Sequence, residues 1–380
     1  MLDELVSRLP MSGLRFSVEY RLAGSEADAY AAARDICVEQ TVECPVAILP
    51  ERIRQGILGR VESFEKGSDG ARRARISYPI EVAGSELTQL LNVIYGNVSI
   101  KPGIRVEGLE LPEAILRNFQ GPRFGRKGLR DLLRATRRAL LSTALKPMGL
   151  TATGLAELAS QFALGGIDII KDDHGLANQP FADFRERVAR CAEAVSDANR
   201  KTGFRSLYAP NVTAPADQVQ ERAHFAKRQG AGGVLVAPGL VGFDAIRRLA
   251  DDEALALPVL THPAFQGTYV LSPEHGISHE VLFGVLPRLA GADITIYPNF
   301  GGRFSFTQDE CRSIVHGTEL PLGGIRPIFP APGGGMRIDR VPELLAFYGP
   351  ETVFLIGGDL MSAGPEIIEN CRTFRRLVES

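Results

Sequence analysis

The sequence lacks the features that mark membrane, secreted or nucleic-acid-binding proteins. No apolar run approaches the roughly 18 residues that a membrane helix needs, and the initial MLDELVSRLP has neither the apolar core nor the cleavage pattern of a signal peptide. A net charge of −2 provides no general attraction to nucleic acid or to an anionic membrane. We therefore expect a cytoplasmic protein that acts on a small molecule and binds neither nucleic acid nor a membrane.

Cysteine is scarce, and its spacing indicates neither a disulfide framework nor a zinc site. The five cysteines are an odd number, and no two of them stand at CxxC spacing. We expect free thiols in a reducing compartment. The dinucleotide fingerprint GxGxxG after a first strand is also missing, which disfavours an open doubly wound sheet.

From about residue 139 a short apolar run followed by a helical stretch repeats eight times. The runs are, in order, LLSTAL, IDII, SLYA, GVLVA, PVLT, ITIY, RPIF and TVFLI. The segments between them, such as FADFRERVARCAEAVSDANRK, have apolar residues at i, i+3 and i+4 and charges on the opposite side. Eight buried strands alternating with helices predict a (β/α)₈ TIM barrel of the α/β class. An open doubly wound sheet is the alternative.

The residues before the barrel follow a different pattern. FSVEYRL alternates apolar and polar residues like a half-buried strand, and EADAYAAARDICVEQ is helical. ARRARISYPI predicts a strand, and LTQLLNVIYGNVSI predicts a helix that leads into a strand. We expect a smaller ferredoxin-like α+β domain over residues 1–125 and the barrel over residues 126–380. The basic stretch GPRFGRKGLRDLLRATRRA joins them, and we expect its charges on a solvated helix face.

Polar residues follow the strands of the predicted barrel, where barrels of this kind carry their active sites. Lys146 follows the first run, and KDDH, residues 171–174, follows the second. The fifth run ends next to His262, and the sixth leads into a glycine-rich loop with Arg303, which we expect to clamp an anionic group of the substrate. Asp173 and His174 are suitable metal ligands, whereas a protonated lysine cannot bind a metal.

Two glycine clusters follow the last two strands. Gly334 and Gly335 come after the seventh run, and Gly357 and Gly358 come after the eighth. Glycine lets backbone N–H groups approach an anion closely, and barrels often bind phosphate at these positions. We expect a phosphate site here, although the glycines could equally form turns alone, and Asp359 would repel a dianion.

Several segments resemble the large chain of ribulose-bisphosphate carboxylase/oxygenase. GGIDIIKDDH resembles the activation-lysine motif GGxDFxKDDE of that family, and LKPMGLT resembles its first-strand segment KPKxGL. LNVIYGNV, ICVEQTVE and FLIGGDL are similar to its GNVFG, AAESSTGT and FGGG segments. The resemblance runs in order over about residues 14–362, and it implies the same two-domain fold.

Departures from the family pattern identify the chain as a RuBisCO-like protein, of the non-carboxylating branch. In THPAF, Pro263 replaces an arginine that binds the second phosphate, and Ile296 and Gly333 replace a histidine and a serine. The lysine that steers CO2 in carboxylases is replaced by Arg303. The resemblance therefore implies a substrate with one phosphate, or a small sugar acid, and no CO2 fixation.

The resemblance also implies a metal site. Lys171 would be a metal ligand as the carbamate formed with CO2, and Asp173 would be a second ligand. His174 stands where the family has a glutamate ligand. The family's metal is Mg²⁺, but an imidazole favours another divalent metal, or else an acid–base role for His174.

Further roles are implied for residues from both domains. Lys146 matches a proton-shuttling lysine, and Asn97 and Glu39 match residues that reach the site from the partner subunit. We therefore expect a homodimer with active sites at the subunit interface. Some enolase-type relatives use a lysine at the position of Asn97, which this chain lacks.

The chemistry shared by this family is removal of a proton α to a carbonyl that a cation polarises. We expect Lys146 to be the base, and His174 or His262 to return the proton. This scheme predicts isomerisation of a ketose monophosphate of the 5-methylthioribulose 1-phosphate type. Two alternatives stay open, namely decarboxylation of a 3-oxo sugar acid or its phosphate (3-oxo-isoapionate type) and a non-catalytic regulatory role.

Overall fold

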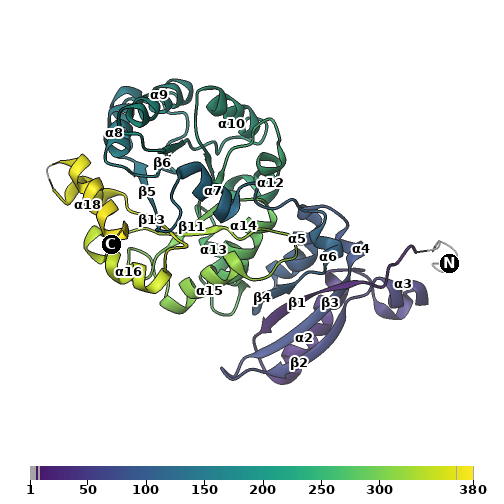
Figure 1. Ribbon diagram of the computed structural model, residues 1–380. Helices are drawn as coiled ribbons and strands as arrows, with labels where there is room; N and C mark the ends of the chain where they lie inside the picture. The colour runs from purple at the N-terminus through teal and green to yellow at the C-terminus, as the bar shows by residue number, and fades with distance from the viewer. Residues whose placement is uncertain (1–5, 7–8, 365, 380) are drawn as a thin grey trace. The chain divides into compact units, whose positions relative to one another are not determined.

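The computed structural model describes Val6, residues 9–364 and residues 366–379 (Figure 1). The chain divides into two compact units. The first extends to Phe119 and includes Gln266–Leu282 and Pro321–Ile325, and the second comprises Gln120–Phe265, Phe283–Leu320 and the residues from Arg326 onward. Segments 266–282 and 321–325, which the sequence assigned to the second domain, thus belong to the first unit. None of the helices in the described part of the chain has the length and hydrophobicity to cross a membrane.

The first unit has the βαββαβ order of a ferredoxin-like fold, as predicted. Its main elements are β1 (Arg15–Leu22), α2 (Glu26–Glu39), β2 (Arg60–Lys66), β3 (Arg72–Pro79), α5 (Leu87–Tyr95) and β4 (Ile104–Glu110). The sheet order is β10-β4-β1-β3-β2, where β10 (Gly276–Ile277) pairs parallel to β4 and the other pairs are antiparallel. Shorter elements are η1 (Val46–Ile48), α3 (Glu51–Gly56), α4 (Ile80–Ala83), η2 (Asn97–Ile100), α6 (Glu113–Leu116) and α13 (Gly267–Val270).

The strand expected after helix α5 is instead the 3₁₀ helix η2, Asn97–Ile100. The side chain of Gln40 accepts a hydrogen bond from the Val98 N–H (3.3 Å) and donates to the carbonyls of Asn92 and Val93. This side chain stabilises a tight turn, whereas the β-branched residues of the segment predicted a strand. Strand β2 was not predicted, because its residues are mostly exposed and carry little apolar signal.

The second unit is the predicted barrel of eight parallel strands. These are β5 (Leu140–Leu145), β6 (Ile169–Asp172), β7 (Leu207–Ala209), β8 (Val234–Val236), β9 (Val259–Thr261), β11 (Ile294–Pro298), β12 (Phe329–Gly333) and β13 (Val353–Leu355). They form two four-stranded sheets, β13-β5-β6-β7 and β12-β11-β9-β8, and a bridge between Asn211 and Leu235 joins β7 to β8.

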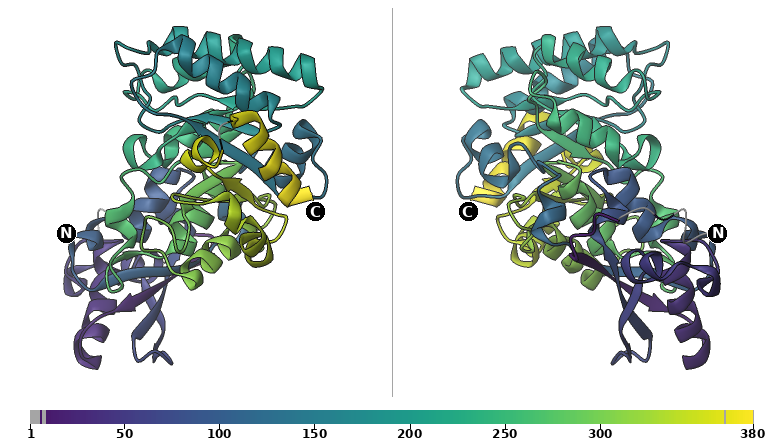
Figure 2. Two further views of the ribbon diagram at one scale, coloured as in Figure 1. Left: turned by 90° about the vertical axis from the view of Figure 1, so that its left-hand side faces the viewer. Right: turned by 90° about the vertical axis from the view of Figure 1, so that its right-hand side faces the viewer.

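Helices surround the strands (Figures 1 and 2). They are α7 (Gly125–Leu133), α8 (Ala152–Leu164), α9 (Phe184–Thr202), α10 (Val219–Arg228), α11 (Pro238–Val241), α12 (Phe243–Asp251), α14 (Leu286–Leu289), α15 (Gln308–Glu319), α16 (Val341–Tyr348), α17 (Gly358–Ser362) and α18 (Ile367–Glu379), with a π-helix η3 (Glu280–Val285) and a 3₁₀ helix η4 (Ile338–Arg340).

The barrel core contains at least one apolar residue from every strand. The cluster includes Leu140, Ile169, Ala209, Leu235, Leu260, Ile294, Phe329 and Val353, together with Leu129 and Leu133 of α7. Successive side chains of a strand point to opposite faces, so positions at two-residue steps from these core residues face the interior. Lys146, Lys171, Asp173 and His262 are all at such positions, which directs them toward the C-terminal mouth of the barrel.

The basic stretch before the barrel matches the expected solvated face only in part: Lys127, Arg134 and Arg137 are exposed, whereas Arg130 is buried. Arg130 is only 8% exposed, and its guanidinium donates to the carbonyls of Ala135, Arg138 and Pro350. Leu129 and Leu133 of the same helix join the core. Helix α7 therefore covers the N-terminal end of the barrel, with its arginine satisfying loop carbonyls that would otherwise be buried without partners.

The seventh strand is displaced from the predicted RPIF to Phe329–Gly333, which includes Pro330 and Pro332. The Phe329 N–H donates to the backbone carbonyl of Asp293, which precedes β11. The backbone nitrogens of the alternate residues 330 and 332 therefore point away from β11. Proline is tolerated there because no backbone ladder joins β12 to β13 in the described part of the chain.

Candidate active site

Lys146 and Asp173 meet where strands β5 and β6 end. The two strands pair in parallel with Leu145 opposite Asp172, and the Asp173 N–H donates to the Leu145 carbonyl (3.3 Å). The Lys146 Nζ lies 3.2 Å from Asp173 Oδ1, and both side chains are partly exposed. A Cβ added to Gly357, after β13, would lie 3.4 Å from the Lys146 Nζ. Lys146 therefore lies between the ends of its two neighbouring strands.

Lys171 lies inside strand β6 rather than in the loop after it. It is 2% exposed, and its Nζ donates to the carbonyl of Asp172 (3.0 Å). Burial lowers the pKa of Lys171 to about 8, which outweighs the opposing effect of Asp173, while Lys146 also lowers it. About a tenth of this amine is therefore uncharged at pH 7, far more than for an ordinary lysine, and the uncharged amine is the form that reacts with CO2.

The carboxylate of Asp173 carries its charge in spite of partial burial. Burial on its own raises the pKa of Asp173, but the positive charges of Lys146 and Lys171 outweigh it, and the net pKa is lowered. Its second oxygen, Oδ2, lies 3.4 Å from His174 Nδ1 and accepts a hydrogen bond from the Gly175 N–H.

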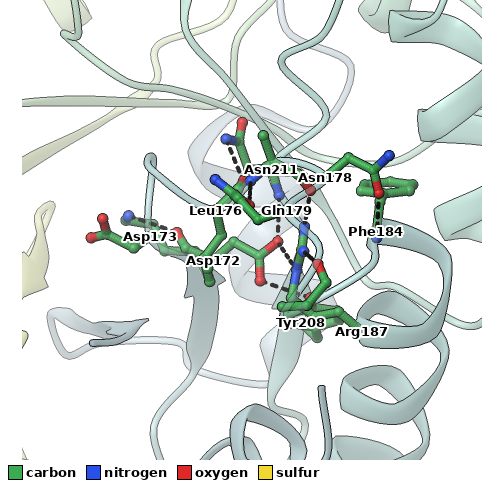
Figure 3. Close-up of polar contacts among 12 residues, drawn as sticks. Asp172, Asp173, Leu176, Asn178, Gln179, Phe184, Arg187, Tyr208 and Asn211 are labelled. Carbon is green, nitrogen blue, oxygen red and sulfur yellow. Dashed lines mark hydrogen bonds and ion pairs between the residues drawn. The ribbon is translucent and has the colours of Figure 1, made fainter. Parts of the chain in front are cut away.

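Asp172 does not belong to this cluster, although the sequence places it between Lys171 and Asp173. Strand alternation turns its fully buried carboxylate outward, toward Arg187 of α9 and Tyr208 of β7, while Asp173 lies on the other side (Figure 3). The distances are 3.2 Å from Arg187 Nε to Oδ2 and 2.8 Å from the Tyr208 hydroxyl to Oδ1.

His174 and His262 form a stacked pair at the mouth of the barrel. Their ring centroids are 4.2 Å apart, and the ring planes differ by 12°. The Ala264 N–H donates to His262 Nδ1 (3.1 Å), so Nε2 carries the proton of the neutral ring. Burial lowers the pKa of His174 below 6.5 and that of His262 well below it, and the nearby lysines act in the same direction. Both imidazoles are therefore mainly neutral at pH 7.

The predicted phosphate glycines follow strands β12 and β13, and β13 pairs directly with β5. Gly334 (φ 82°) and Gly335 (φ 88°) have left-handed backbone, and a Cβ at Gly335 would lie 2.9 Å from the Arg303 backbone nitrogen. The Arg303 N–H donates to the Gly334 carbonyl (3.2 Å), which brings the Arg303 loop against these glycines. Gly357 and Gly358 stand at the start of α17.

Asp359 is directed toward a neighbouring backbone group. Its Oδ2 accepts a hydrogen bond from the Ile338 N–H (2.7 Å). This contact partly offsets the repulsion that its charge would exert on a phosphate.

Glu39 and Asn97 lie together in the first unit. The Asn97 amide donates to Glu39 Oε1 (3.0 Å), and the Lys101 Nζ is 4.0 Å from Glu39 Oε2. The structure thus brings these two predicted residues to each other. Their contribution to the site of a second subunit, and the roles given to the barrel residues, stay predictions.

The barrel residues fit a divalent cation held by oxygen atoms. In the described residues no three His, Cys, Asp or Glu side chains are grouped to hold a metal. A metal bound by Asp173 would therefore need a ligand of another type beside it. Lys171, buried and two residues away on the same face of β6, supplies one if its amine is carbamylated. Carboxylate and carbamate oxygens together with water suit Mg²⁺.

Comparison with known proteins shows to which family the chain belongs. Residues 125–364 match the catalytic domain of the ribulose bisphosphate carboxylase large chain. The ribulose bisphosphate carboxylase-like protein 1 of Rhodopseudomonas palustris is 41% identical over 96% of this chain and 98% of its own length. The 5-methylthioribulose-1-phosphate isomerase of Rhodospirillum rubrum is 37% identical over 95% of each chain.

A solved structure gives the same result. The crystal structure of a Rubisco-like protein from Rhodopseudomonas palustris covers 96% of this chain and 97% of its own, with a TM-score of 0.87 and 38% identity. Sequence identity and fold similarity thus extend over nearly the whole chain, and the family match covers residues 125–364. The protein belongs to the ribulose bisphosphate carboxylase large-chain family and, within it, to the RuBisCO-like proteins.

Proposed function

We propose that this protein is an isomerase that enolises a small ketose monophosphate of the 5-methylthioribulose 1-phosphate type. The observation that carries the proposal is the cluster at the barrel mouth, where the Lys146 ammonium lies 3.2 Å from Asp173 and next to a stacked pair of neutral imidazoles. A cation beside a neutral base is what proton abstraction α to a carbonyl requires. The relative named as a 5-methylthioribulose-1-phosphate isomerase supports this substrate class.

In this mechanism His174 accepts the α-proton. Its Nδ1 faces Asp173 Oδ2 at 3.4 Å, which leaves Nε2 for the substrate. Asp173 stabilises the imidazolium that forms, in the way that a carboxylate supports a catalytic histidine. His174 then returns the proton to the former carbonyl carbon. The hydroxyl proton on the carbon that lost its hydrogen passes to the former carbonyl oxygen, so the carbonyl moves by one position and the protons balance.

Lys146 has a different role here from the base expected from the sequence. Its Nζ forms an ion pair with Asp173 Oδ1 at 3.2 Å, and an ammonium group in such a pair cannot accept a proton. The ammonium donates instead to the oxygen on which negative charge develops in the enediolate. A divalent cation held by Asp173 and a carbamylated Lys171 would supply further polarisation of the same carbonyl.

The phosphate binds beside the glycine-rich loops that follow β11 and β12. Gly334 and Gly335 expose backbone there, and Arg303 is attached to them by its own backbone hydrogen bond. Arg303 is exposed in its glycine-rich loop and supplies a guanidinium to the phosphate. A site of this kind suits a substrate with one phosphate.

Proton exchange in D2O tests the proposal. The protein is incubated with Mg²⁺, bicarbonate and a panel of ketose monophosphates that includes 5-methylthioribulose 1-phosphate, and the products are followed by NMR. We expect deuterium at the carbons next to the carbonyl and a new ketose isomer, without release of CO2. CO2 release from a 3-oxo sugar acid would assign a decarboxylase instead, and the absence of exchange with every compound would favour a non-catalytic role.

A further inference from the structure

The turn that carries Asp173 and His174 is a short, defined structure. The Leu176 N–H donates to the Asp173 carbonyl (3.0 Å), and the Gly175 N–H donates to the Asp173 side chain (3.3 Å). The Gln179 side chain adds a bond to the Gly175 carbonyl (2.7 Å) and accepts one from the Ala177 N–H (2.9 Å), but none of these four bonds is made by the backbone of His174. The precision that proton transfer needs, within about 0.5 Å, must come from groups beneath the turn.

Asn211 supplies the bonds beneath the turn. It follows strand β7, is 2% exposed, and donates both amide hydrogens to the turn, to the His174 carbonyl (3.0 Å) and to the Leu176 carbonyl (2.9 Å). Its Oδ1 accepts from the Thr213 N–H (3.1 Å), so both ends of the side chain are engaged. Figure 3 shows Asn211 beside Leu176 of this turn.

Asn211 is in turn fixed by the buried carboxylate of Asp172. The Asn211 N–H donates to Asp172 Oδ2 (3.0 Å), and the same carboxylate accepts from Arg187 and Tyr208. Arg187 also donates to the Ala182 and Ala177 carbonyls, at 2.8 Å each, and so holds the rest of the loop after β6.

The chemistry of this network indicates that it holds the turn in position rather than adding to the stability of the fold. Arg187 and Asp172 are both fully buried, and a buried ion pair contributes little net stability, because desolvation cancels most of the attraction. Directional, charge-assisted hydrogen bonds do, however, restrict the positions of the groups they join. This network joins the outer face of β6 to the backbone of His174.

We propose that Asn211 is a positioning residue for the reaction: it fixes the turn that presents Asp173 and His174, and the Asp172–Arg187 pair fixes Asn211. The catalytic part of this inference depends on the proposed function, whereas its structural part does not. The phosphate glycines lie on other strands, so loss of Asn211 should slow proton transfer more than it weakens substrate binding.

The test compares Asn211→Ala with a matched variant at the other end of the same strand. Asn199 of α9 donates to the Ser206 carbonyl (2.9 Å) and accepts from the Ser206 N–H (2.9 Å), just before β7, where the barrel carries no active-site residues. Asn199→Ala therefore removes a comparable structural amide. Asn211→Ser, whose hydroxyl can donate one of the two bonds, measures partial rescue.

For Asn211→Ala we expect kcat for deuterium incorporation to fall roughly 10- to 100-fold with KM changed by less than about threefold. Asn211→Ser should lie between this variant and the wild type. Asn199→Ala should lower the melting temperature but leave kcat within about twofold of the wild type. Wild-type kcat in folded Asn211→Ala, or an equal loss of kcat in Asn199→Ala, would overturn the proposal.

Amide hydrogen exchange separates this inference from the proposed function, because it needs no substrate. Exchange in peptides covering residues 173–177 should be about tenfold faster in Asn211→Ala and unchanged in Asn199→Ala. If the wild type exchanges no substrate proton, the proposed function fails while this measurement still decides whether Asn211 holds the turn. Unchanged exchange at residues 173–177 in Asn211→Ala would refute the structural part.

If Asn211→Ala does not fold, Tyr208→Phe replaces it as the test variant. This substitution removes a single bond to Asp172, so we expect a smaller effect in the same direction.

Discussion

The two ends of the barrel differ in how they treat charged residues: the N-terminal end packs them against the core, and the C-terminal end leaves some of them partly exposed. At the N-terminal end, Leu129 and Leu133 pack into the core, and Arg130 is neutralised by carbonyls and by Glu351. At the C-terminal end, Lys146 and Asp173 remain partly exposed, and the charge of Asp173 is balanced by Lys146 and Lys171. Packing at one end therefore maintains the fold, and it allows the other end to keep a costly group such as the buried amine of Lys171.

The largest effect on activity should come from Lys171→Met. This substitution keeps the volume of the side chain and removes the amine, so kcat should fall by about 100- to 1000-fold. The melting temperature should stay the same or rise, because a buried polar group is replaced by an apolar one. Deuterium incorporation and thermal melting measure the two quantities. A marked loss of stability would show that Lys171 serves the fold rather than the reaction.

A somewhat smaller loss of activity is expected for His174→Asn. Removal of a general acid–base group costs about 100-fold or more in kcat. His224→Asn is the matched control, since His224 is bonded to Asp252 (2.8 Å) on the outside of the barrel. Its kcat should remain at the wild-type value, and equal losses in the two variants would exclude a specific role for His174.

A substitution at the N-terminal end of the barrel should lower the stability of the protein without changing its activity. Leu129→Ala removes a fully buried side chain, and we expect a loss of about 2–5 kcal/mol in the free energy of unfolding, measured in urea. At a temperature where the variant is folded, its kcat should equal that of the wild type. A lowered kcat would mean that the two ends of the barrel are coupled.

The smallest effect concerns pH. The pKa of His262 is well below 6.5 in the folded state because the ring is buried near two lysines, so the unfolded chain binds more protons below that pH. Stability should therefore be complete above pH 6.5 and fall as the pH is lowered, by up to about 1.4 kcal/mol per pH unit. Melting curves of the wild type and of His262→Asn between pH 5 and 8 test this, and the variant should lose less. Parallel curves would contradict it.

The sequence predicted much of the fold and the position of the site, because both follow from local periodicity. The run IDII ahead of KDDH placed Lys171 and Asp173 at the end of a strand, and the two lie on the inner face of β6 or next to it. Glycine clusters at 334–335 and 357–358 were found in the same way. The grouping of Asn97 with Glu39 came from family resemblance and not from spacing.

Other features depend on contacts between distant segments, which local patterns do not reveal. Strand β6 continues through Asp172 because Arg187, 15 residues further on, neutralises the buried carboxylate. The sequence placed Asn211 after a strand but gave no sign that its amide reaches back to His174. The sequence did not predict β12 correctly, because prolines are usually excluded from strands. Pro330 and Pro332 fit here because, among the described residues, no hydrogen-bond ladder joins β12 to β13.

Those prolines have a further consequence for how the protein avoids aggregation. A strand edge without a partner exposes N–H groups to which another chain can add, and proline is one of the residues that block such addition. The side of β12 that lacks a ladder presents Pro330 and Pro332, which have no N–H to offer. Transient opening of the cylinder along this seam would thus expose an edge that a foreign strand cannot readily extend.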